Sequence, residues 1–210
     1  MVFRRLLAAL VCLVAVSGCA LAGPAVDADG TVLGEVGGLD VTDPVLLQSA
    51  WWTWAASEPE ETNPVSDTTG EYCDRGQQVG VWLLAGSFGE TVTRRCTVPG
   101  EVPFAGPVVN LVADTRTACE EFMRDAEGVV TLGSRQLPLQ EMGPVAITYR
   151  AVDGNPVTGD GGEFDGYACG LWFSDPLGLE PGEDVLTIEG RSGGFSVSVT
   201  YELTVSAPGE

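Results

Sequence analysis

The chain has 210 residues, of which 30 are acidic and 10 are basic, so its formal net charge is −20 at neutral pH. Such a surface repels nucleic acid and anionic lipid headgroups. All the basic residues are arginine and histidine is absent. This excludes Ser-His-Asp and Cys-His catalytic sites, histidine-ligated zinc, and the lysine of a phosphate-binding loop or a Schiff base. The composition therefore favours a protein that is not an enzyme and binds no nucleic acid.

Residues 1–18 have the organisation of an export signal. Two adjacent arginines precede an apolar run at 6–16, which is too short to span a bilayer. The segment VSGC at 16–19 resembles the lipobox of bacterial lipoproteins, in which the cysteine is acylated and cleavage occurs in front of it. We predict a lipid on Cys19 that holds the protein on the membrane surface. Ordinary secretion is the alternative, because Ala-Leu-Ala at 20–22 also fits a conventional cleavage site.

The mature chain divides into a tether and one domain. Removal of residues 1–18 takes away two basic residues and no acidic ones, which gives a net charge of −22. Residues 19–41 are rich in glycine, alanine and aspartate, a composition typical of a flexible tether. Residues 42–206 have a length normal for one domain, and 207–210 form a short tail.

The first half of the domain predicts a helix and a hairpin. Asp43 is a suitable N-cap, Pro44 suits the first helical position, and apolar residues then recur at helical spacing, with an end expected before Pro59. Residues 79–85 and 91–98 predict two strands. We expect these strands to form a hairpin through the glycine-containing turn between them.

The second half predicts mostly strands. A strand at 108–113 is followed by a helix at 117–127 that Gly128 would end. Further strands are expected at 145–152, 167–173 and 185–189. From 195 to 205 apolar and polar residues alternate without interruption, which predicts a strand with one buried face. This pattern predicts a mainly β domain, an antiparallel two-sheet sandwich or jelly roll with two flanking helices.

The cysteine count agrees with export. After one cysteine leaves with the signal and Cys19 takes the lipid, an even set remains: Cys73, Cys96, Cys119 and Cys169. We expect two disulfides. Among three possible connectivities we favour Cys73–Cys96, which flanks the predicted hairpin, and Cys119–Cys169, which closes the remaining half. A zinc site of four thiolates is the alternative, but the spacings do not suit one.

Several blocks of the sequence share a pattern with known proteins. They are NP at 63–64, DTTG at 67–70, Cys73, Gln77, VWLLAGSFG at 81–89, RCTVP at 95–99 and Asn110, with a tail of PL at 176–177, Gly182 and a Phe-rich strand ending in YELTV at 201–205. The blocks resemble a family of exported bacterial proteins, common in actinobacteria, whose biochemical activity is unassigned. The resemblance implies export and a mostly β domain, and it supplies no reaction. Within these blocks Asp67, Gln77 and Asn110 are candidate ligand-binding residues.

Trp52 is a further candidate ligand-binding residue. On the predicted helix it falls off the stripe shared by Trp51 and Trp54, and the polar segment 58–78 follows. An exposed indole beside acids and amides suits stacking on a sugar ring. Core packing of all three tryptophans is the other interpretation.

Acidic residues suggest two other kinds of site. In the loop 153–165 the side chains of Asp153, Asn155 and Asp160 are candidate oxygen ligands for Ca²⁺, although the spacing is not that of an EF-hand and a solvated loop is the simpler interpretation. A carboxylate pair, such as Asp67 with Glu71 or with Asp114, is a candidate acid and base for glycoside hydrolysis. Thirty acids make some such pairing inevitable by chance.

Two functional hypotheses follow. The first is a membrane-anchored envelope lipoprotein whose domain is a non-catalytic binding or structural module, with a cell-wall polysaccharide or an envelope protein as partner. The second is a carboxylate-dependent glycan hydrolase or a carbohydrate-binding module. Both place the protein outside the cytoplasm, at the outer face of the cell membrane or freely secreted.

Overall fold

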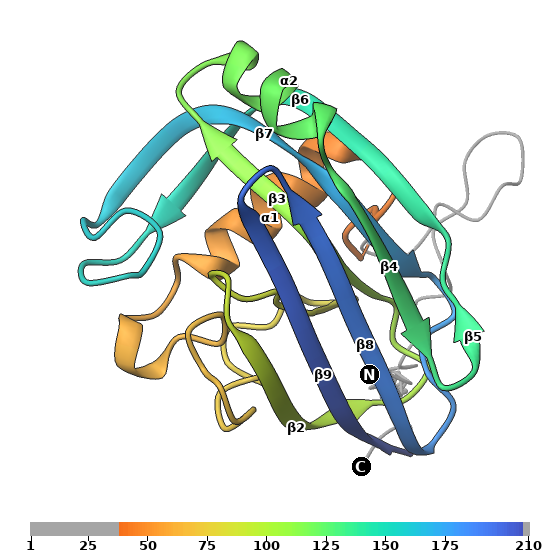
Figure 1. Ribbon diagram of the computed structural model, residues 1–210. Helices are drawn as coiled ribbons and strands as arrows, with labels where there is room; N and C mark the ends of the chain where they lie inside the picture. Colours follow the sequence, from red (N-terminus) through yellow and green to blue (C-terminus); the bar gives the residue numbers. More distant parts are fainter. Residues whose placement is uncertain (1–37, 208–210) are drawn as a thin grey trace, which may run out of the picture. The chain divides into compact units, whose positions relative to one another are not determined.

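The computed structural model describes residues 38–207 (Figure 1). The predicted export signal, the predicted lipid-bearing Cys19 and nearly all of the predicted tether lie outside this range, as does most of the tail. The helices and the 3-10 turn of the described part are α1 (Pro44–Ala55), η1 (Glu60–Thr62) and α2 (Arg116–Arg124). Its strands are β1 (Trp82–Leu83), β2 (Thr91–Pro99), β3 (Phe104–Ala113), β4 (Glu127–Leu132), β5 (Arg135–Gln136), β6 (Leu139–Ala151), β7 (Gly162–Asp175), β8 (Gly182–Ser192) and β9 (Phe195–Ser206).

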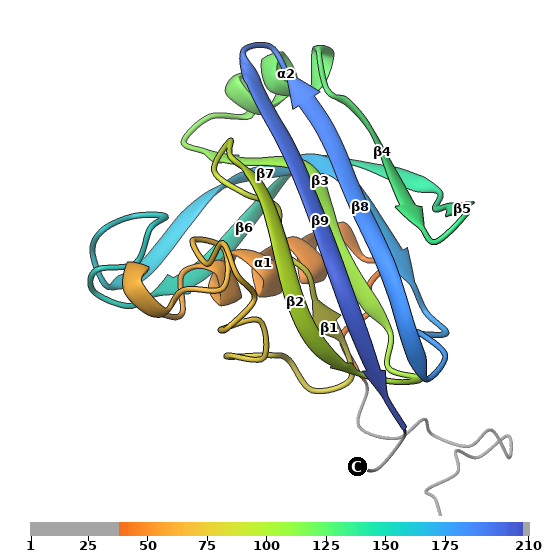
Figure 2. The same cartoon turned by 60° about the horizontal axis from the view of Figure 1, so that its bottom comes forward.

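The strands form two sheets that pack face to face, as the alternating patterns predict. One sheet has the order β1-β3-β7-β6 and the other β2-β9-β8-β4-β5. In Figure 2 the five-stranded sheet lies in front, and the four-stranded sheet lies between it and α1. Most neighbours are antiparallel, but β1–β3 and β2–β9 are parallel. The prediction of a mainly β two-sheet sandwich with two helices is confirmed.

The predicted hairpin at 79–98 is wrong. β1 pairs with β3 in one sheet, whereas β2 pairs with β9 in the other, so the segment between β1 and β2 is a crossover between the sheets. The backbone of Ala85 in this crossover is held by the hydroxyl of Tyr201. This hydroxyl donates to the carbonyl oxygen of Ala85 at 2.8 Å and accepts from the N–H of Ala85 at 3.0 Å. Glycines permit a turn but do not choose the partner of the strand that follows, and here contacts distant in sequence make that choice.

α1 forms as the sequence predicts. The Asp43 carboxylate accepts hydrogen bonds from the N–H groups of Val45 and Leu46 at 2.8 and 2.9 Å, which caps the first turn, and Pro44 opens the helix. The buried side of α1 lies on the outer face of the four-stranded sheet. There the ring of Trp51 meets that of Trp172 edge to face, with 5.8 Å between centroids.

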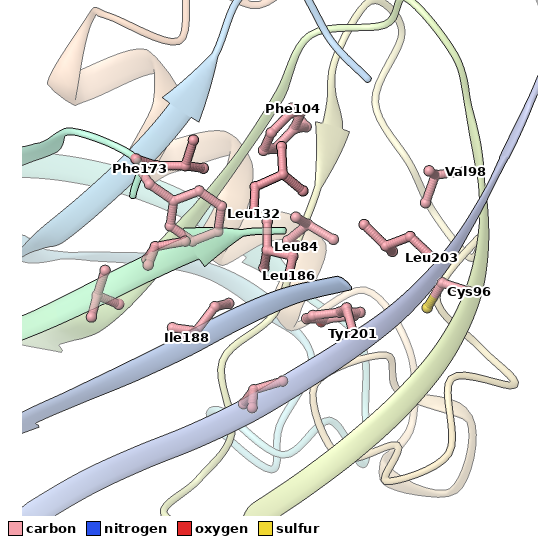
Figure 3. Packing of buried hydrophobic residues seen from close by; sticks show 14 of the residues in the cluster. Leu84, Cys96, Val98, Phe104, Leu132, Phe173, Leu186, Ile188, Tyr201 and Leu203 are labelled. Carbon is pink, nitrogen blue, oxygen red and sulfur yellow. The ribbon is translucent and has the colours of Figure 1, made fainter. Parts of the chain in front are cut away.

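The main core lies between the sheets (Figure 3). It contains the inward residues of β9, where the predicted alternation is confirmed from Val197 to Val205, while Phe195 is half-buried. Facing them are side chains of β3 and β7, among them Phe104 and Phe173, whose ring centroids lie 6.3 Å apart. Burial of these apolar surfaces is the main favourable contribution to folding.

The region after α2 differs from the sequence prediction. The helix ends at Arg124, and β4 begins at Glu127, so Gly128 lies within a strand opposite Gly190. A Cβ at Gly128 would lie 2.4 Å from Cγ1 of Val108, which is far below contact distance. Glycine is therefore needed here because the two sheets approach closely, and not as a helix stop. β4 and β5 are absent from the prediction because both are short and lack a long alternating pattern.

Both predicted disulfides are present. Cys73 and Cys96 have Cα atoms 6.2 Å apart, and Cys119 and Cys169 have Cα atoms 5.8 Å apart. The first joins the segment before β1 to β2, and the second joins α2 to β7. Two disulfides indicate a protein of an oxidising compartment. Among residues 38–207 no helix has both the length and the apolar character needed to cross a bilayer.

Candidate functional site

The segment between α1 and β1, which contains Asp67 and Gln77, is held by its own polar side chains. Asn63 is fully buried, and its amide donates to the carbonyl oxygens of Ala55 and Glu58 at 2.8 and 3.0 Å. The side-chain oxygen of Asn63 accepts from the N–H of Val65 at 2.9 Å. Every hydrogen-bonding group of this side chain therefore contributes to the fold of the segment.

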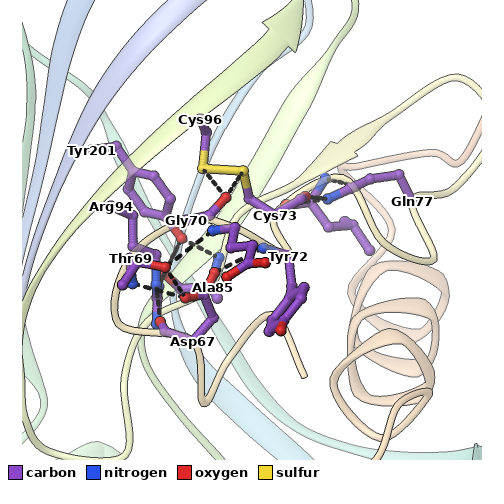
Figure 4. Close-up of a disulfide and its surroundings, with 12 residues drawn as sticks. Asp67, Thr69, Gly70, Tyr72, Cys73, Gln77, Ala85, Arg94, Cys96 and Tyr201 are labelled. Carbon is purple, nitrogen blue, oxygen red and sulfur yellow. Dashed lines mark hydrogen bonds between the residues drawn. A yellow bond between two sulfur atoms is a disulfide. The ribbon is translucent and has the colours of Figure 1, made fainter. Parts of the chain in front are cut away.

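Asp67 is bound in the same way (Figure 4). One carboxylate oxygen accepts from the N–H and the hydroxyl of Thr69 at 2.7 and 2.8 Å, and the other accepts from the N–H of Tyr72 at 2.9 Å. Burial raises the pKa of Asp67, but these hydrogen bonds outweigh it and hold the pKa below its ordinary value. A carboxylate that is ionised and occupied by backbone donors stabilises a turn and is poorly suited to act as a general acid.

Gln77 closes the segment onto β1. Its amide donates to the carbonyl oxygens of Cys73 and Leu83 at 2.8 and 3.0 Å, and its oxygen accepts from the N–H of Leu83 at 2.7 Å. The Cys73–Cys96 disulfide lies beside it (Figure 4). The structure thus gives Asp67 and Gln77 structural roles, and the side-chain atoms that would bind a ligand already have partners.

Arg94 lies at the centre of this region and is completely buried. Its guanidinium donates five hydrogen bonds, to the carbonyl oxygens of Val65, Asp67, Ala85 and Gly86 and to the hydroxyl of Tyr201, at 2.6 to 3.0 Å. Arg94 was not among the residues predicted from the sequence to have a functional role. An apolar alternation in β2 that is interrupted by one inward arginine is the signal that marks it.

Trp52 is buried, with 7% of its surface exposed, so the predicted exposed aromatic platform is wrong. Its ring packs at 5.0 Å from Trp51 and 6.4 Å from Tyr149 of β6, in a buried cluster that also includes Val65. Contacts with elements distant in sequence therefore bury the side of the helix that local periodicity leaves exposed. The indole N–H of Trp52 has no hydrogen-bond partner within residues 38–207. In contrast, those of Trp51 and Trp54 donate to the carbonyl oxygens of Leu84 and Arg75.

Trp52 and Asn110, two of the predicted ligand-binding residues, line one cavity, which we call the β3 cleft. It has a volume of about 330 Å³. It lies beside the part of β3 that has no neighbouring strand on this edge in the described chain, because β1 pairs only with Phe104 and Ala105. The residues that line it come from seven segments: Trp51, Trp52, Ala55, Val65, Gly86, Ser87, Phe88, Pro107, Val108, Asn110, Leu111, Phe122, Val157, Phe195 and Val197.

The β3 cleft is apolar with few polar groups. Five aromatic rings contribute to its wall, and none of the lining residues is charged. Ser87 is occupied, because its hydroxyl donates to the carbonyl oxygen of Glu90 at 2.7 Å. The amide nitrogen of Asn110, like the Trp52 indole, is buried without a partner in the described part of the chain. An apolar pocket with a few placed polar groups is the usual form of a small-molecule site.

The wall of the cleft depends on Arg94. Val65 and Gly86, whose carbonyl oxygens accept from the guanidinium at 2.8 Å each, both line the cavity. Arg94 therefore positions two segments that belong to different parts of the fold. Phe88, which follows Gly86, is 46% exposed at the edge of the cavity. The glycine-containing segment around Phe88 was predicted to be only a turn, and its place at the edge of a cavity depends on the tertiary structure.

The side chains of the acidic loop before β7 bind mainly to the backbone of the loop itself. Asn155 is buried, and its oxygen accepts from the N–H groups of Val157 and Thr158 at 2.9 Å each. Asp153 accepts from the N–H of Gly161 at 2.8 Å. Within residues 38–207 no group of three or more acidic or cysteine side chains is placed to hold a metal ion. In this structure the side chains of Asp153 and Asn155 close the loop, and Asp160 contributes its backbone oxygen, which accepts from Asn155 and Thr158.

The suggested carboxylate pairs are not brought into the β3 cleft. Asp114 lies at the end of β3, in a shallow hollow with Val45 and Tyr167. Burial and the negative charge of Asp114 raise the pKa of Tyr149. A larger hollow of about 520 Å³ lies over the outer face of β2, β9 and β8, but four of its nine lining residues are charged and it has no aromatic wall. We therefore consider the β3 cleft the best candidate site.

Comparisons with protein-family models, with curated proteins and with solved structures find no match to this chain.

Proposed function

We propose that this protein is an exported lipoprotein, anchored through Cys19, whose domain is a non-catalytic binding module that takes an apolar ligand in the β3 cleft. The observation that carries the proposal is the cleft itself, a cavity of about 330 Å³ lined by five aromatic rings and by no charged residue. An apolar cavity of this size with aromatic walls is the usual form of a site that binds a small molecule.

A non-catalytic role is supported by the chemistry of the lining. The cleft presents no carboxylate, arginine or cysteine, and its one hydroxyl, that of Ser87, is hydrogen-bonded to the backbone. Acid-base or nucleophilic catalysis needs a titratable or activated group within reach of the substrate. The lining instead suits recognition of shape and apolar surface.

Binding at the cleft is tested with the neutral apolar dye Nile red and a variant that fills the cavity. Gly86 lines the cleft, and a Cβ there would meet only Cγ1 of Val197, at 3.8 Å, so Gly86→Leu places a side chain in the cavity without a backbone clash. We expect Gly86→Leu to abolish the fluorescence rise that the wild type produces. Gly143→Leu is the matched control, because Gly143 has open space around it and does not line the cleft. Equal dye binding by all three proteins would overturn the proposed site.

The anchor is tested separately by intact-mass spectrometry of the protein purified from the membrane of its own cells. We expect an N-terminal Cys19 that carries a diacylglycerol group, and a protein released into the medium when Cys19 is changed to serine. An unmodified N-terminus at Gly23 would show that the protein is freely secreted. That result would leave the binding proposal intact.

A further inference from the structure

We infer that the Cys73–Cys96 disulfide is a redox-sensitive switch. A partner that carries a dithiol reduces this disulfide while Cys119–Cys169 stays intact, and residues 68–76, which we call the Cys73 turn, then detach from β2. The inference goes beyond the proposed binding function, because it concerns a covalent bond outside the lining of the β3 cleft. It follows from two differences between the disulfides, in the segments that they join and in their exposure.

The Cys73 turn has little buried surface of its own to hold it in place. Among residues 68–76 only Gly70 is buried, and Tyr72 and Cys73 are half-buried. The turn belongs to neither sheet. Segments with few buried apolar contacts open locally at a lower free energy than the strands of a core. The covalent link to Cys96 is therefore a large part of what keeps the turn against β2 (Figure 4).

The remaining attachments of the turn lie on either side of the disulfide. The carbonyl oxygen of Thr69 accepts from the N–H of Arg95 in β2 at 2.8 Å. That of Arg75 accepts from the indole N–H of Trp54 in α1 at 2.8 Å. The disulfide holds the middle of the turn and joins residues that are 23 positions apart, so its loss allows the chain many more open conformations.

The second disulfide is protected from reduction by the sheet around it. Cys119 and Cys169 are both completely buried, and Cys169 lies in β7, which is paired with β3 on one side and β6 on the other. A reductant reaches this bond only after part of the sheet has opened. In the first disulfide Cys96 is buried but Cys73 is partly exposed. Reduction of a disulfide depends on access to one of its sulfurs, which favours attack at Cys73.

Reduction proceeds by two exchange steps and transfers two electrons to the protein. A thiolate of the dithiol attacks Sγ of Cys73 and forms a mixed disulfide, and the bond between the two protein sulfurs breaks with Cys96 as the leaving thiolate. The second thiolate of the dithiol then attacks the sulfur of the first, which releases Cys73 as a thiolate. The dithiol is oxidised to a disulfide, and the two protons that it lost go to Cys73 and Cys96.

The turn is connected to the wall of the β3 cleft through Asp67 and Arg94, and this connection rests on the proposed function. The carboxylate of Asp67 binds the N–H of Tyr72 in the turn, and the carbonyl oxygen of Asp67 accepts from Nε of Arg94 at 2.6 Å. Arg94 also donates to the carbonyl oxygen of Val65, which lines the cleft. Opening of the turn should therefore loosen this wall and reduce the affinity of the cleft for its ligand.

The selectivity of reduction is measured on the intact mature protein under native conditions. The protein is treated with dithiothreitol for increasing times, free thiols are alkylated with iodoacetamide, and the labelled peptides are identified by mass spectrometry. We expect Cys73 and Cys96 to be labelled at least about tenfold faster than Cys119 and Cys169, because their exposure requires only local opening. Equal rates, or faster labelling of Cys119 and Cys169, would overturn the inference.

Detachment of the turn is measured by hydrogen exchange of two amides in the selectively reduced protein. The N–H of Tyr72 donates to the Asp67 carboxylate at 2.9 Å, and the N–H of Arg95 donates across the contact to Thr69. Both should exchange faster after reduction, while the amides shared between β8 and β9 keep their rates. Unchanged exchange of Tyr72 and Arg95 in the reduced protein would show that the turn stays in place and that the disulfide is not a switch.

Two double variants repeat this measurement without a reductant. Cys73→Ala combined with Cys96→Ala removes the proposed switch and should accelerate exchange in the Cys73 turn. Cys119→Ala combined with Cys169→Ala is the matched control and should leave exchange in the turn as in the wild type. If a variant does not fold, the selectively reduced wild type still decides the question.

Nile red binding separates the switch from the proposed function. We expect the selectively reduced protein to lose affinity for the dye. If the turn opens on reduction but the affinity for the dye is unchanged, the connection between the switch and the cleft is wrong. If the oxidised protein binds no dye, the proposed binding function is wrong, whereas labelling and hydrogen exchange still test the switch.

Discussion

Arg94 of β2 and Tyr201 of β9 are hydrogen-bonded neighbours in the five-stranded sheet. Together they hold the segment that connects this sheet to β1 of the four-stranded sheet. Nη1 of Arg94 donates to the Tyr201 hydroxyl at 2.8 Å, and the guanidinium carbon lies 5.5 Å from the centroid of the ring. Both residues also bind the carbonyl oxygen of Ala85 (Figure 4). The pair therefore positions the crossover from β1 to β2 and, through Gly86, one wall of the β3 cleft.

Substitution of Arg94 by methionine should destabilise the protein by about 3 to 5 kcal/mol. The change removes five hydrogen bonds and leaves several buried carbonyl oxygens without a donor, and the cost of such unsatisfied groups exceeds that of a lost surface contact. Urea unfolding measured by circular dichroism gives the difference in free energy of unfolding.

Arg95→Met is the matched control for Arg94. Arg95 is the next residue of β2, and its largely exposed side chain pairs with Glu202 on the solvent side at 2.7 Å. Exposed pairs of this kind contribute about 0 to 1 kcal/mol, so the control should lose little stability. Similar losses for the two variants would contradict the central role of Arg94.

The free energy of unfolding should decrease at acidic pH, and protonation of Asp67 should account for part of this decrease. The pKa of this carboxyl is lowered in the folded state, so the folded protein binds its proton less readily than the unfolded chain does. Its contribution is therefore fully present above the ordinary value of 3.8 and is lost as the pH falls through the lower value of the folded state.

We expect Asp67→Asn to be less stable than the wild type at neutral pH and to lose less stability between neutral pH and acid. Urea unfolding at a series of pH values measures both effects. Glu71→Gln, an exposed acid in the same segment, should reproduce the wild-type curve apart from a small offset. Parallel curves for the wild type and Asp67→Asn would refute a role for the Asp67 carboxylate in acid sensitivity.

Gly70→Ala should lower the free energy of unfolding of the protein by about 2 kcal/mol or more, because Gly70 lies where the segment after α1 packs against β2. Gly70 has a φ of +94°, and a Cβ there would lie 2.3 Å from the oxygen and 2.6 Å from the nitrogen of Arg95. These are backbone atoms of a paired strand, so moving them would break hydrogen bonds of the sheet at a large cost in free energy. Thermal unfolding measures the effect.

Gly194→Ala is the control for the alanine substitution. Gly194 precedes β9, its φ is not positive, and a Cβ there would meet nothing within 4 Å. We expect this variant to match the wild type or to exceed it slightly, because alanine restricts the unfolded chain. A loss at Gly194 as large as that at Gly70 would show that the close contact with Arg95 is not the cause.

Short patterns in the sequence were sufficient to predict several elements of the structure. Asp43 followed by Pro44 predicted the start of α1, and the alternation from Val197 to Val205 predicted which face of β9 is buried. The even number of cysteines predicted two disulfides, and the favoured pairing is confirmed even though the hairpin used to argue for it does not exist. Capping and periodicity act within one element, so the local sequence determines them.

The candidate site shows the limit of such signals. Trp52 was singled out as an exposed platform, and it does line the candidate site, but as a buried wall of a cavity and not as a surface. Asp67 and Gln77 were singled out with it and instead hold the backbone. A polar side chain in a loop looks the same in sequence whether its partner is a ligand or a nearby N–H group.

By itself the sequence determined the class of fold, the number of disulfides and the exclusion of histidine and lysine chemistry. Only the tertiary structure decided that β1 and β2 belong to different sheets, that Arg94 is buried, and that seven distant segments enclose the β3 cleft. The physical reason is one of range. An element and its buried face are encoded by neighbours in the chain, whereas strand partners and cavities depend on contacts between residues far apart in sequence, which periodicity does not report.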